Sequence, residues 1–317
     1  MRITFLDAKT IGDVPNLKRF KEFGEFIVFQ TTKKNERINH IKNSEIIITN
    51  KVIIDKEVID NCNNLKLICV AATGKNNVDL DYAKIKGLQV KNVVDYSTES
   101  VAQYTFALVL SLINRVNYYN NYVISGEYSK SDIFTHIGES FWQISGKRFG
   151  IIGLGNIGKK VARIAVAFEA EVIYYSTTGK NYDKIFKRVS FEELLSTSNI
   201  ITIHAPLNEN TKNLISLKEM KQMNPETYLI NMARGGIINE ADLSKAINDN
   251  IIAGAATDVL TNEPIKDDNP LLKIKKKEKI IITPHIAWAS IESRTLLVDK
   301  IYNNVKEYIC KTTNSNI

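Results

Sequence analysis

Short runs of apolar, β-branched residues alternate with longer polar segments along this chain of 317 residues. The pattern is typical of parallel β-strands joined by helices, because helices cover both faces of such a sheet and its strands are therefore apolar. The predicted strands are residues 2–7, 45–49, 65–72, 88–93, 149–153, 171–175, 200–204, 227–232, 252–257 and 279–283. They form two α/β units, of which the first ends near residue 97 and the second begins near residue 148.

Two longer helices are predicted, one before and one after the second group of strands. Ser or Thr followed by acidic residues favours an N-terminal cap, so Thr98-Glu99-Ser100 predicts a helix from residue 98 to about residue 116. Residues 290–309 contain neither Pro nor Gly and predict a final helix. Residues 117–147 are rich in Tyr, Asn and Ser, and we expect them to form an ordered excursion. At about 150 residues per domain, the length also predicts two domains.

A G-x-G-x-x-G motif, made by Gly153, Gly155 and Gly158, lies between a predicted strand and a helical run. Its first glycine allows a tight turn, its second lets the backbone approach a pyrophosphate, and its third lets the helix pack on the strand. The helix N-terminus then presents free N–H groups to the phosphates. A glycine-rich turn in an ordinary βαβ unit is the alternative, but the full strand–turn–helix–strand context favours a dinucleotide site.

The strand at 171–175 does not end in the acidic residue that usually holds the adenosine ribose. Ser176, Thr177 and Thr178 follow it, and then Lys180. No carboxylate here repels a 2′-phosphate, and these side chains could bind one, but the hydroxyls could equally hold a free ribose. The predicted coenzyme is therefore NAD or NADP.

A candidate catalytic set lies where strands end, at the edge where open α/β sheets bind ligands. His285, Arg234 and Glu263 each follow a predicted strand, and His204 ends one. Arg can bind a carboxylate through two parallel hydrogen bonds, and a Glu beside a His stabilises the charged imidazole and fixes its orientation. A protonated His can then give a proton to a carbonyl oxygen as a hydride arrives. The structural alternative is that Glu263 caps a turn, Arg234 makes a surface ion pair and His204 is a core residue.

The composition favours a small anionic substrate. Lys and Arg number 42 against 35 Asp and Glu, a net charge of +7, and the excess is spread along the chain apart from a cluster at 273–279. We therefore expect no nucleic-acid partner.

No run approaches the ~18 apolar residues of a membrane span, so we expect no membrane partner either. Cys62, Cys69 and Cys310 form no C-x-x-C pair, which predicts free thiols and a cytoplasmic protein.

Five ordered motifs resemble those of the D-isomer-specific 2-hydroxyacid dehydrogenases, and the resemblance covers nearly the full chain. The motifs are residues 153–158 (GLGNIG), 204–207 (HAPL) with Thr211, 231–236 (NMARGG), 258–259 (DV) with 263–264 (EP), and 283–285 (TPH). Within that family, residues 49–51, 73–79 and 284–290 are most similar to the glycerate dehydrogenase/hydroxypyruvate reductase branch.

The resemblance implies a role for each candidate residue. Arg234 would bind the substrate carboxylate and carbonyl, and His285 would be the general acid in reduction and the base in oxidation, with Glu263 as its partner. Lys51, Thr73 and Gly74 would face the substrate from the other domain, and Asp258 would lie near the nicotinamide carboxamide. The coenzyme would be lined by Gly153, Gly155, Asn156, Ile157, Gly158, Ser176, Ala205, Pro206, Thr211, Met232, Ala233, Arg234 and Asp258.

The resemblance also implies the organisation and the reaction. A Rossmann coenzyme domain, residues 98–288, would be inserted into a flavodoxin-like substrate domain, residues 1–97 plus 289–317. A homodimer formed through the coenzyme domain would account for the aromatic excursion. The expected activity is NAD(P)-dependent reduction of a small 2-oxo acid, most of all hydroxypyruvate or glyoxylate. A D-lactate-type reductase and a non-enzymatic NAD-sensing co-regulator are the alternatives.

Overall fold

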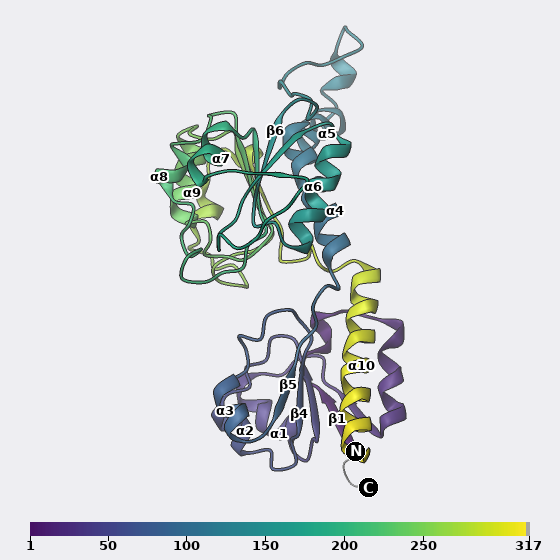
Figure 1. The fold of residues 1–317 in the computed structure, drawn as a ribbon. Coiled ribbons are helices and arrows are strands. Elements are labelled where there is room, and N and C mark those ends of the chain that lie inside the picture. Colours follow the sequence, from purple (N-terminus) through teal and green to yellow (C-terminus); the bar gives the residue numbers. More distant parts are fainter. Residues whose placement is uncertain (315–317) are drawn as a thin grey trace. The chain divides into compact units, whose positions relative to one another are not determined.

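The computed structural model describes residues 1–314, and the chain divides into two compact units (Figure 1). Unit 1 comprises Met1–Ser97 and the C-terminal segment from Ala289 onward, and unit 2 comprises Thr98–Trp288. The chain therefore leaves unit 1 after its fifth strand and returns to it with its last helix. Residues 315–317, which the sequence assigned to the substrate domain, lie outside the described part of the chain.

Unit 1 is built on a five-stranded parallel sheet with the order β2-β1-β3-β4-β5. The strands are β1 (Arg2–Phe5), β2 (Glu25–Val28), β3 (Ile46–Thr49), β4 (Leu67–Val70) and β5 (Gln89–Lys91). One face packs against the short helices α1 (Arg37–Ile41), α2 (Lys56–Asp60) and α3 (Leu80–Ile85). The 3-10 helix η2 (Pro15–Phe23) and the long helix α10 (Ile291–Asn314) lie together on the other face (Figure 1). This strand order is that of flavodoxin-like folds.

Unit 2 is built on a seven-stranded parallel sheet with the order β12-β11-β10-β9-β6-β7-β8. The strands are β6 (Arg148–Ile152), β7 (Glu171–Tyr175), β8 (Lys187–Arg188), β9 (Ile200–Ile203), β10 (Tyr228–Asn231), β11 (Gly254–Thr257) and β12 (Ile280–Ile282). Helices α4 (Thr98–Ile113) and α6 (Asn156–Ala167) cover one face, and α7 (Phe191–Thr197), α8 (Leu217–Met220) and α9 (Glu240–Asn248) cover the other (Figure 1). The order reverses between β6 and β9, and ligands bind at such a switch point, outside the carboxyl ends of the strands.

The predicted fold class is confirmed, and every predicted strand is present within a few residues of its predicted bounds. Two strands were not predicted. β2 is a partly exposed edge strand without a fully apolar run, and β8 is only two residues long. Neither has the buried, β-branched run that marks a central parallel strand. No helix among the described residues is long and apolar enough to cross a membrane.

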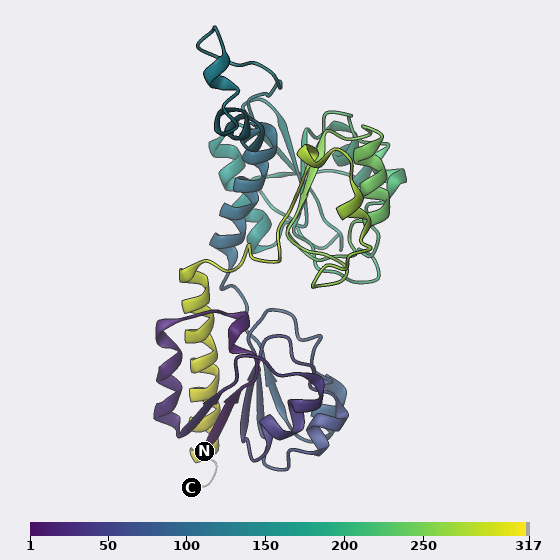
Figure 2. The same cartoon turned by 180° about the vertical axis from the view of Figure 1, so that it is seen from behind.

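The predicted helix over 98–116 is interrupted. α4 ends at Ile113, Arg115 has a left-handed backbone with φ of 52°, and α5 (Val116–Ile124) begins immediately after it. The 3-10 helix η4 (Tyr128–Lys130) follows, and residues 116–142 are here called the arm. The middle of the arm projects from unit 2 in both ribbon views, whereas Trp142 at its end packs on Tyr228 of β10 (Figures 1 and 2). The aromatic excursion is thus partly helical.

Candidate active site

Three loops at the carboxyl ends of neighbouring strands carry the predicted catalytic residues. Arg234 follows β10, Glu263 follows β11 and His285 follows β12, and these strands are adjacent in the sheet. Gly235 allows the first two loops to come into backbone contact. A Cβ at this position would lie 2.0 Å from the carbonyl of Leu260, so a larger residue would force the loops apart. The topology and this close approach bring the three loops together at one edge.

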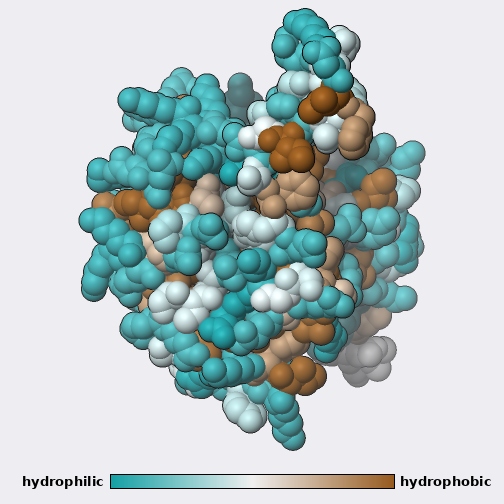
Figure 3. All heavy atoms as spheres, turned by 90° about the horizontal axis from the view of Figure 1, so that it is seen from above, coloured by the Kyte–Doolittle hydropathy of each residue, from teal (hydrophilic) through white to brown (hydrophobic). Residues whose placement is uncertain are grey.

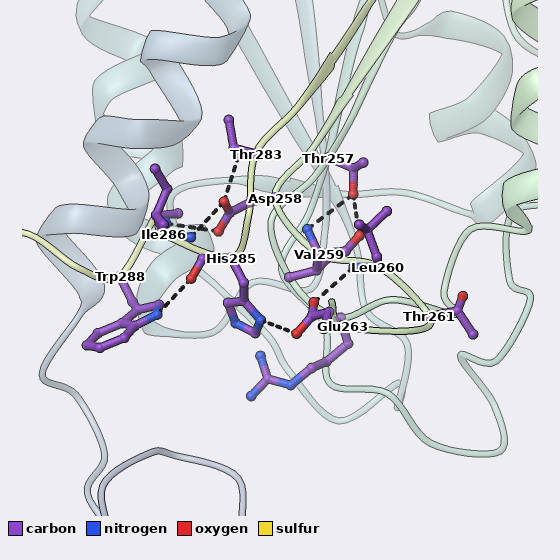
Figure 4. Close-up of polar contacts among 12 residues, drawn as sticks. Thr257, Asp258, Val259, Leu260, Thr261, Glu263, Thr283, His285, Ile286 and Trp288 are labelled. Carbon is purple, nitrogen blue, oxygen red and sulfur yellow. Dashed lines mark hydrogen bonds and ion pairs between the residues drawn. The ribbon is translucent and has the colours of Figure 1, made fainter. Parts of the chain in front are cut away.

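His285 and Glu263 form a hydrogen-bonded pair at this edge. His285 Nδ1 lies 2.7 Å from Glu263 Oε2, and the backbone N–H of Leu260 donates to Glu263 Oε1 at 2.9 Å (Figure 4). The carboxylate is therefore held by its own loop and in turn orients the imidazole. A carboxylate partner at Nδ1 keeps a proton on that nitrogen, so Nε2 is the position from which a proton can be exchanged with a substrate.

A buried carboxylate, Asp258, shapes the loop that carries His285. Its side-chain oxygens accept hydrogen bonds from Thr283 Oγ1 at 2.6 Å and from the N–H groups of Ile286 and Ala287 at 2.9 Å each (Figure 4). The N–H of His285 donates to the Asp258 carbonyl at 2.8 Å, and His285 itself has a left-handed φ of 55°. Burial raises the pKa of Asp258, which is 2% exposed. The loop thus wraps around one carboxylate in a conformation that non-glycine residues seldom adopt.

The loop of Arg234 is braced from inside by Asn231. Asn231 Oδ1 accepts from the N–H of Ala233 at 3.1 Å, and Asn231 Nδ2 donates to the carbonyl of Arg234 at 2.9 Å. The Arg234 side chain is exposed, and its Nη1 donates to the Ala233 carbonyl at 2.7 Å. Within the described chain no carboxylate pairs with Arg234, so the alternative of a surface ion pair is not supported. The remaining guanidinium donors suit an external carboxylate.

His204 differs from His285 although it also follows a strand of this sheet. Both of its ring nitrogens are shielded from solvent, and neither has a hydrogen-bond partner among the residues that the structure describes. Burial lowers the pKa of His204 to about 3, so the ring is neutral near pH 7. His204 therefore cannot serve as the proton donor, which agrees with its reading as a structural residue.

The turn between β6 and α6 fits a dinucleotide. Gly153 has φ of 92°, and a Cβ there would lie 2.8 Å from the N–H nitrogen of Ala205. A Cβ at Gly158 would lie 2.3 Å from the carbonyl oxygen of Gly153, so the helix packs tightly on the turn. Gly155 faces open space and is the N-cap of α6, whose first residues are Asn156 and Ile157. An open glycine at a helix N-terminus is the cradle that a pyrophosphate needs.

The other predicted coenzyme residues line the same edge. Ser176 is buried directly after β7, and its hydroxyl has no partner among the described residues. Thr211 donates to the carbonyl of Pro206 at 2.7 Å, which ties back the loop after β9. The buried residues that complete this edge are Ala205, Met232 and Ala233. The structure thus places these residues at the switch-point edge, and their contact with a coenzyme stays a prediction.

Unit 1 carries the remaining candidates at the carboxyl edge of its own sheet. Lys51 follows β3, and Thr73 and Gly74 follow β4. The buried carboxylate of Asp7, which the sequence analysis missed, accepts from the N–H of Lys51 at 2.6 Å and from that of Asn50 at 2.8 Å. Asp7 therefore fixes the backbone that presents Lys51. The available signal was an acidic residue directly after an apolar strand.

Comparison with known proteins gives a consistent picture. Residues 106–287 match the family described as D-isomer specific 2-hydroxyacid dehydrogenase, NAD binding domain. A hydroxypyruvate reductase of Blautia hydrogenotrophica is 36% identical over 317 residues, which cover 98% of this chain and 97% of the relative. Among solved structures, the acyclic imino acid reductase Bsp5 in complex with NADPH and D-Arg superposes with a TM-score of 0.86 at 30% identity, covering 98% of each chain. D-Lactate dehydrogenase of Aquifex aeolicus, complexed with NAD and lactic acid, superposes with a TM-score of 0.84 at 26% identity. The match covers 99% of this chain and 97% of that chain.

Proposed function

This chain belongs to the D-isomer-specific 2-hydroxyacid dehydrogenase family, and from that premise we propose that it reduces hydroxypyruvate or glyoxylate to the corresponding 2-hydroxy acid. Family membership makes it an NAD(P)-dependent oxidoreductase acting on the CH–OH group of 2-hydroxy acids. The observation that carries the proposal is the Glu263–His285 pair, formed by the loops after β11 and β12, beside the strand whose loop carries Arg234. Its Blautia relative, named a hydroxypyruvate reductase, supports the choice of substrate.

In this proposal the side chains of unit 2 handle the substrate's charge and its proton. A reduced nicotinamide coenzyme supplies the hydride when bound. Arg234 binds the carboxylate of the 2-oxo acid through its free guanidinium donors. His285 gives the proton on Nε2 to the carbonyl oxygen, and Glu263 stabilises the charged ring before the transfer and orients it. In the oxidative direction His285 takes the proton back, because the same groups act in reverse.

We assign unit 2 as the coenzyme domain and unit 1 as the substrate domain. The glycine-rich turn and the Arg234, Glu263 and His285 loops all belong to unit 2. Unit 1 contributes Lys51, Thr73 and Gly74, which we propose face the substrate carboxylate. The division into compact units at Ser97 and Ala289 supports this assignment.

A D-lactate-type reaction remains the second candidate within the family. The Aquifex aeolicus enzyme, whose structure contains lactic acid, supports it. A non-enzymatic NAD sensor is less well supported, since a protein that only binds coenzyme has no use for an oriented Glu263–His285 pair.

Steady-state kinetics on hydroxypyruvate, glyoxylate and pyruvate with NADH and NADPH test the reaction. We expect the highest kcat/KM with hydroxypyruvate or glyoxylate. His285→Ala should lower kcat by about 10²–10⁴-fold, the usual contribution of a positioned general acid. Glu263→Gln should lower it less, because the amide keeps a hydrogen bond but not the charge. The Kd for NADH, followed by fluorescence, should stay nearly constant in both variants.

His40→Ala is the matched control, since it removes a partly exposed histidine of unit 1. It should retain wild-type kinetics. A protein that binds NADH tightly but reduces none of these acids would refute the proposal and favour the sensor. Highest kcat/KM with pyruvate would instead favour the D-lactate-type reaction.

We further propose that the protein forms a homodimer through its arm. The arm exposes several large apolar side chains, namely Val123, Ile124, Ile133, Phe134, Ile137 and Phe141. The face shown in Figure 3 is mostly hydrophilic, with separate groups of hydrophobic residues. Large apolar side chains exposed on one segment are typical of a protein–protein contact, and a second copy of the chain would cover them. The cytoplasmic location and the absence of nucleic-acid or membrane partners stay predictions.

A further inference from the structure

The turn that follows β7 is covered by an arginine from the neighbouring strand. The N–H of Gly179 donates to the carbonyl of Ser176 at 3.2 Å, which closes a turn over residues 176–179. Arg188 lies on β8, which pairs with β7, and its Nη1 donates to the carbonyl of Gly179 at 2.9 Å. A guanidinium from outside the glycine fingerprint is thus held at the turn where β7 ends.

Ser176 adds a buried hydroxyl to this turn. The residue is 3% exposed, and its Oγ has no hydrogen-bond partner among the described residues. The end of the second strand of a dinucleotide fold lies beside the adenosine ribose. A buried, unpartnered hydroxyl at that position is costly unless a ligand completes its hydrogen bonds.

The one carboxylate in the connection from β7 to β8 is held elsewhere. Asp183 pairs with Lys159 of α6 at 3.1 Å. It also accepts from the N–H groups of Ile185 at 2.9 Å and Phe186 at 3.3 Å. These contacts lower the pKa of Asp183, with the backbone hydrogen bond to Ile185 as the largest cause. Asp183 is therefore engaged by α6 and by its own turn, and is not available to replace the missing ribose carboxylate.

The turn consequently has a surplus of positive charge. Lys180 and Arg188 are both exposed, and neither has an ion-pair partner in the part of the chain that the structure describes. Arg188 uses one of its five N–H donors on Gly179, which leaves a planar fork of the kind that binds phosphate oxygens. Thr177 and Thr178 provide further hydroxyls.

We propose that Arg188, with Ser176 and Lys180, binds the 2′-phosphate of NADPH, so that this protein binds NADPH at least as tightly as NADH. The inference deepens the proposed function and rests on its coenzyme-binding part alone, not on the substrate. Phosphate oxygens would receive bonds from the guanidinium and from Lys180, and the Ser176 hydroxyl would gain the partner that it lacks.

Binding of coenzyme without substrate tests the proposal. Kd values for NADPH and NADH are measured by quenching of the fluorescence of Trp142 and Trp288, both in unit 2. We expect the Kd for NADPH to equal or fall below that for NADH. Arg188→Ala should raise the Kd for NADPH by about 10–100-fold, as expected for lost hydrogen bonds to a charged group, and change the Kd for NADH less than twofold. Ser176→Asp should weaken the binding of NADPH but not that of NADH, because its charge repels the 2′-phosphate.

Lys187→Ala is the matched control. Lys187 precedes Arg188 on the same strand and pairs with Glu193 at 3.1 Å, so its removal should leave the NADPH/NADH ratio unchanged. Calorimetry with adenosine 2′,5′-bisphosphate against AMP repeats the comparison without the nicotinamide. A wild-type Kd higher for NADPH than for NADH, or a ratio that Arg188→Ala does not alter, would overturn the proposal. Tight NADPH binding without reduction of any 2-oxo acid would instead refute the proposed reaction and leave this site standing.

Discussion

Two histidines at one sheet edge have opposite chemistry because of their surroundings. His285 lies beside a carboxylate at 2.7 Å, and its second nitrogen remains for a substrate. His204 has both nitrogens buried without a partner among the described residues, and burial lowers its pKa to about 3. Burial disfavours a charged imidazole at His204. The proposed proton donor is therefore distinguished by its surroundings, since residue type and strand position are shared.

His204 should make the stability of unit 2 sensitive to acid. Its folded pKa of about 3 lies below the ordinary value near 6.5. Between about pH 3 and pH 6.5 the imidazole is therefore protonated in the unfolded chain and neutral in the folded protein. The free energy of unfolding contributed by this group is present above about pH 6.5 and is lost as pH falls toward 3. Between pH 7 and pH 5 the wild type should lose about 2 kcal/mol more than His204→Phe. Urea unfolding followed by tryptophan fluorescence at both pH values measures this, and equal losses would contradict it.

The positions of the main site residues could be predicted from the sequence, but their supports could not. Arg234, Glu263 and His285 each follow an apolar strand, and parallel strands bring their carboxyl ends to one edge. Asp7 and Arg188 act on turns that are distant in the sequence or carried by another strand, at Lys51 and at Gly179. No local pattern marks such partners, because they are created by the order of strands in the sheet.

At the scale of elements, the site depends on how closely two loops approach. Gly235 lies against the backbone at Leu260, and the N–H of Thr261 donates to Glu240 Oε1 at 2.6 Å, at the start of α9. The loop after β11 is thus held between the loop after β10 and a helix. Since Glu263 belongs to this loop, its position relative to Arg234 is set by backbone contact.

Gly235→Ala should separate these loops. The added Cβ would lie 2.0 Å from the Leu260 carbonyl, and backbone atoms cannot yield as a flexible side chain can. Overpacking of this kind costs about 1–3 kcal/mol of unfolding free energy. We also expect kcat to fall more than NADH affinity, because the displaced loop carries Glu263. Asn262→Ala, an exposed change in the same loop, is the control. Wild-type kcat and melting temperature in Gly235→Ala would show that the loops can part without consequence.

The elements themselves were predictable where burial leaves a mark in the sequence. Central strands such as β3 and β9 are buried throughout and consist of apolar or β-branched residues. β2 and β8 lie at sheet edges, where partial exposure permits mixed residues. The break between α4 and α5 could not be predicted, because no Gly or Pro lies at Arg115 and a left-handed backbone is disfavoured for arginine.

At the scale of the molecule, the arm is the feature that one chain does not explain. Its middle part projects from unit 2, and Phe134 and Ile137 are 90% and 83% exposed. Tyr118 and Tyr122 instead pack against His136, which gives the arm an internal aromatic cluster. The aromatic cluster stabilises the arm, while its other apolar side chains stay exposed to water. Such an arm suits an interface in which a second copy of the chain covers those side chains.

Replacing both Phe134 and Ile137 by Ser should convert the proposed dimer to a monomer. Each side chain would otherwise gain about 1.5–3 kcal/mol on full burial, and a twofold interface counts every such loss twice. Sedimentation velocity should give the mass of two chains for the wild type and of one for the variant. Ile85→Ser is the control, since it removes an apolar side chain of similar exposure (76%) from unit 1. A monomeric wild type would refute the dimer, and a variant that still dimerises would place the interface elsewhere. Coenzyme affinity is the last discriminator: every residue assigned to coenzyme binding lies outside the arm, so loss of the dimer should leave the Kd for NADH unchanged.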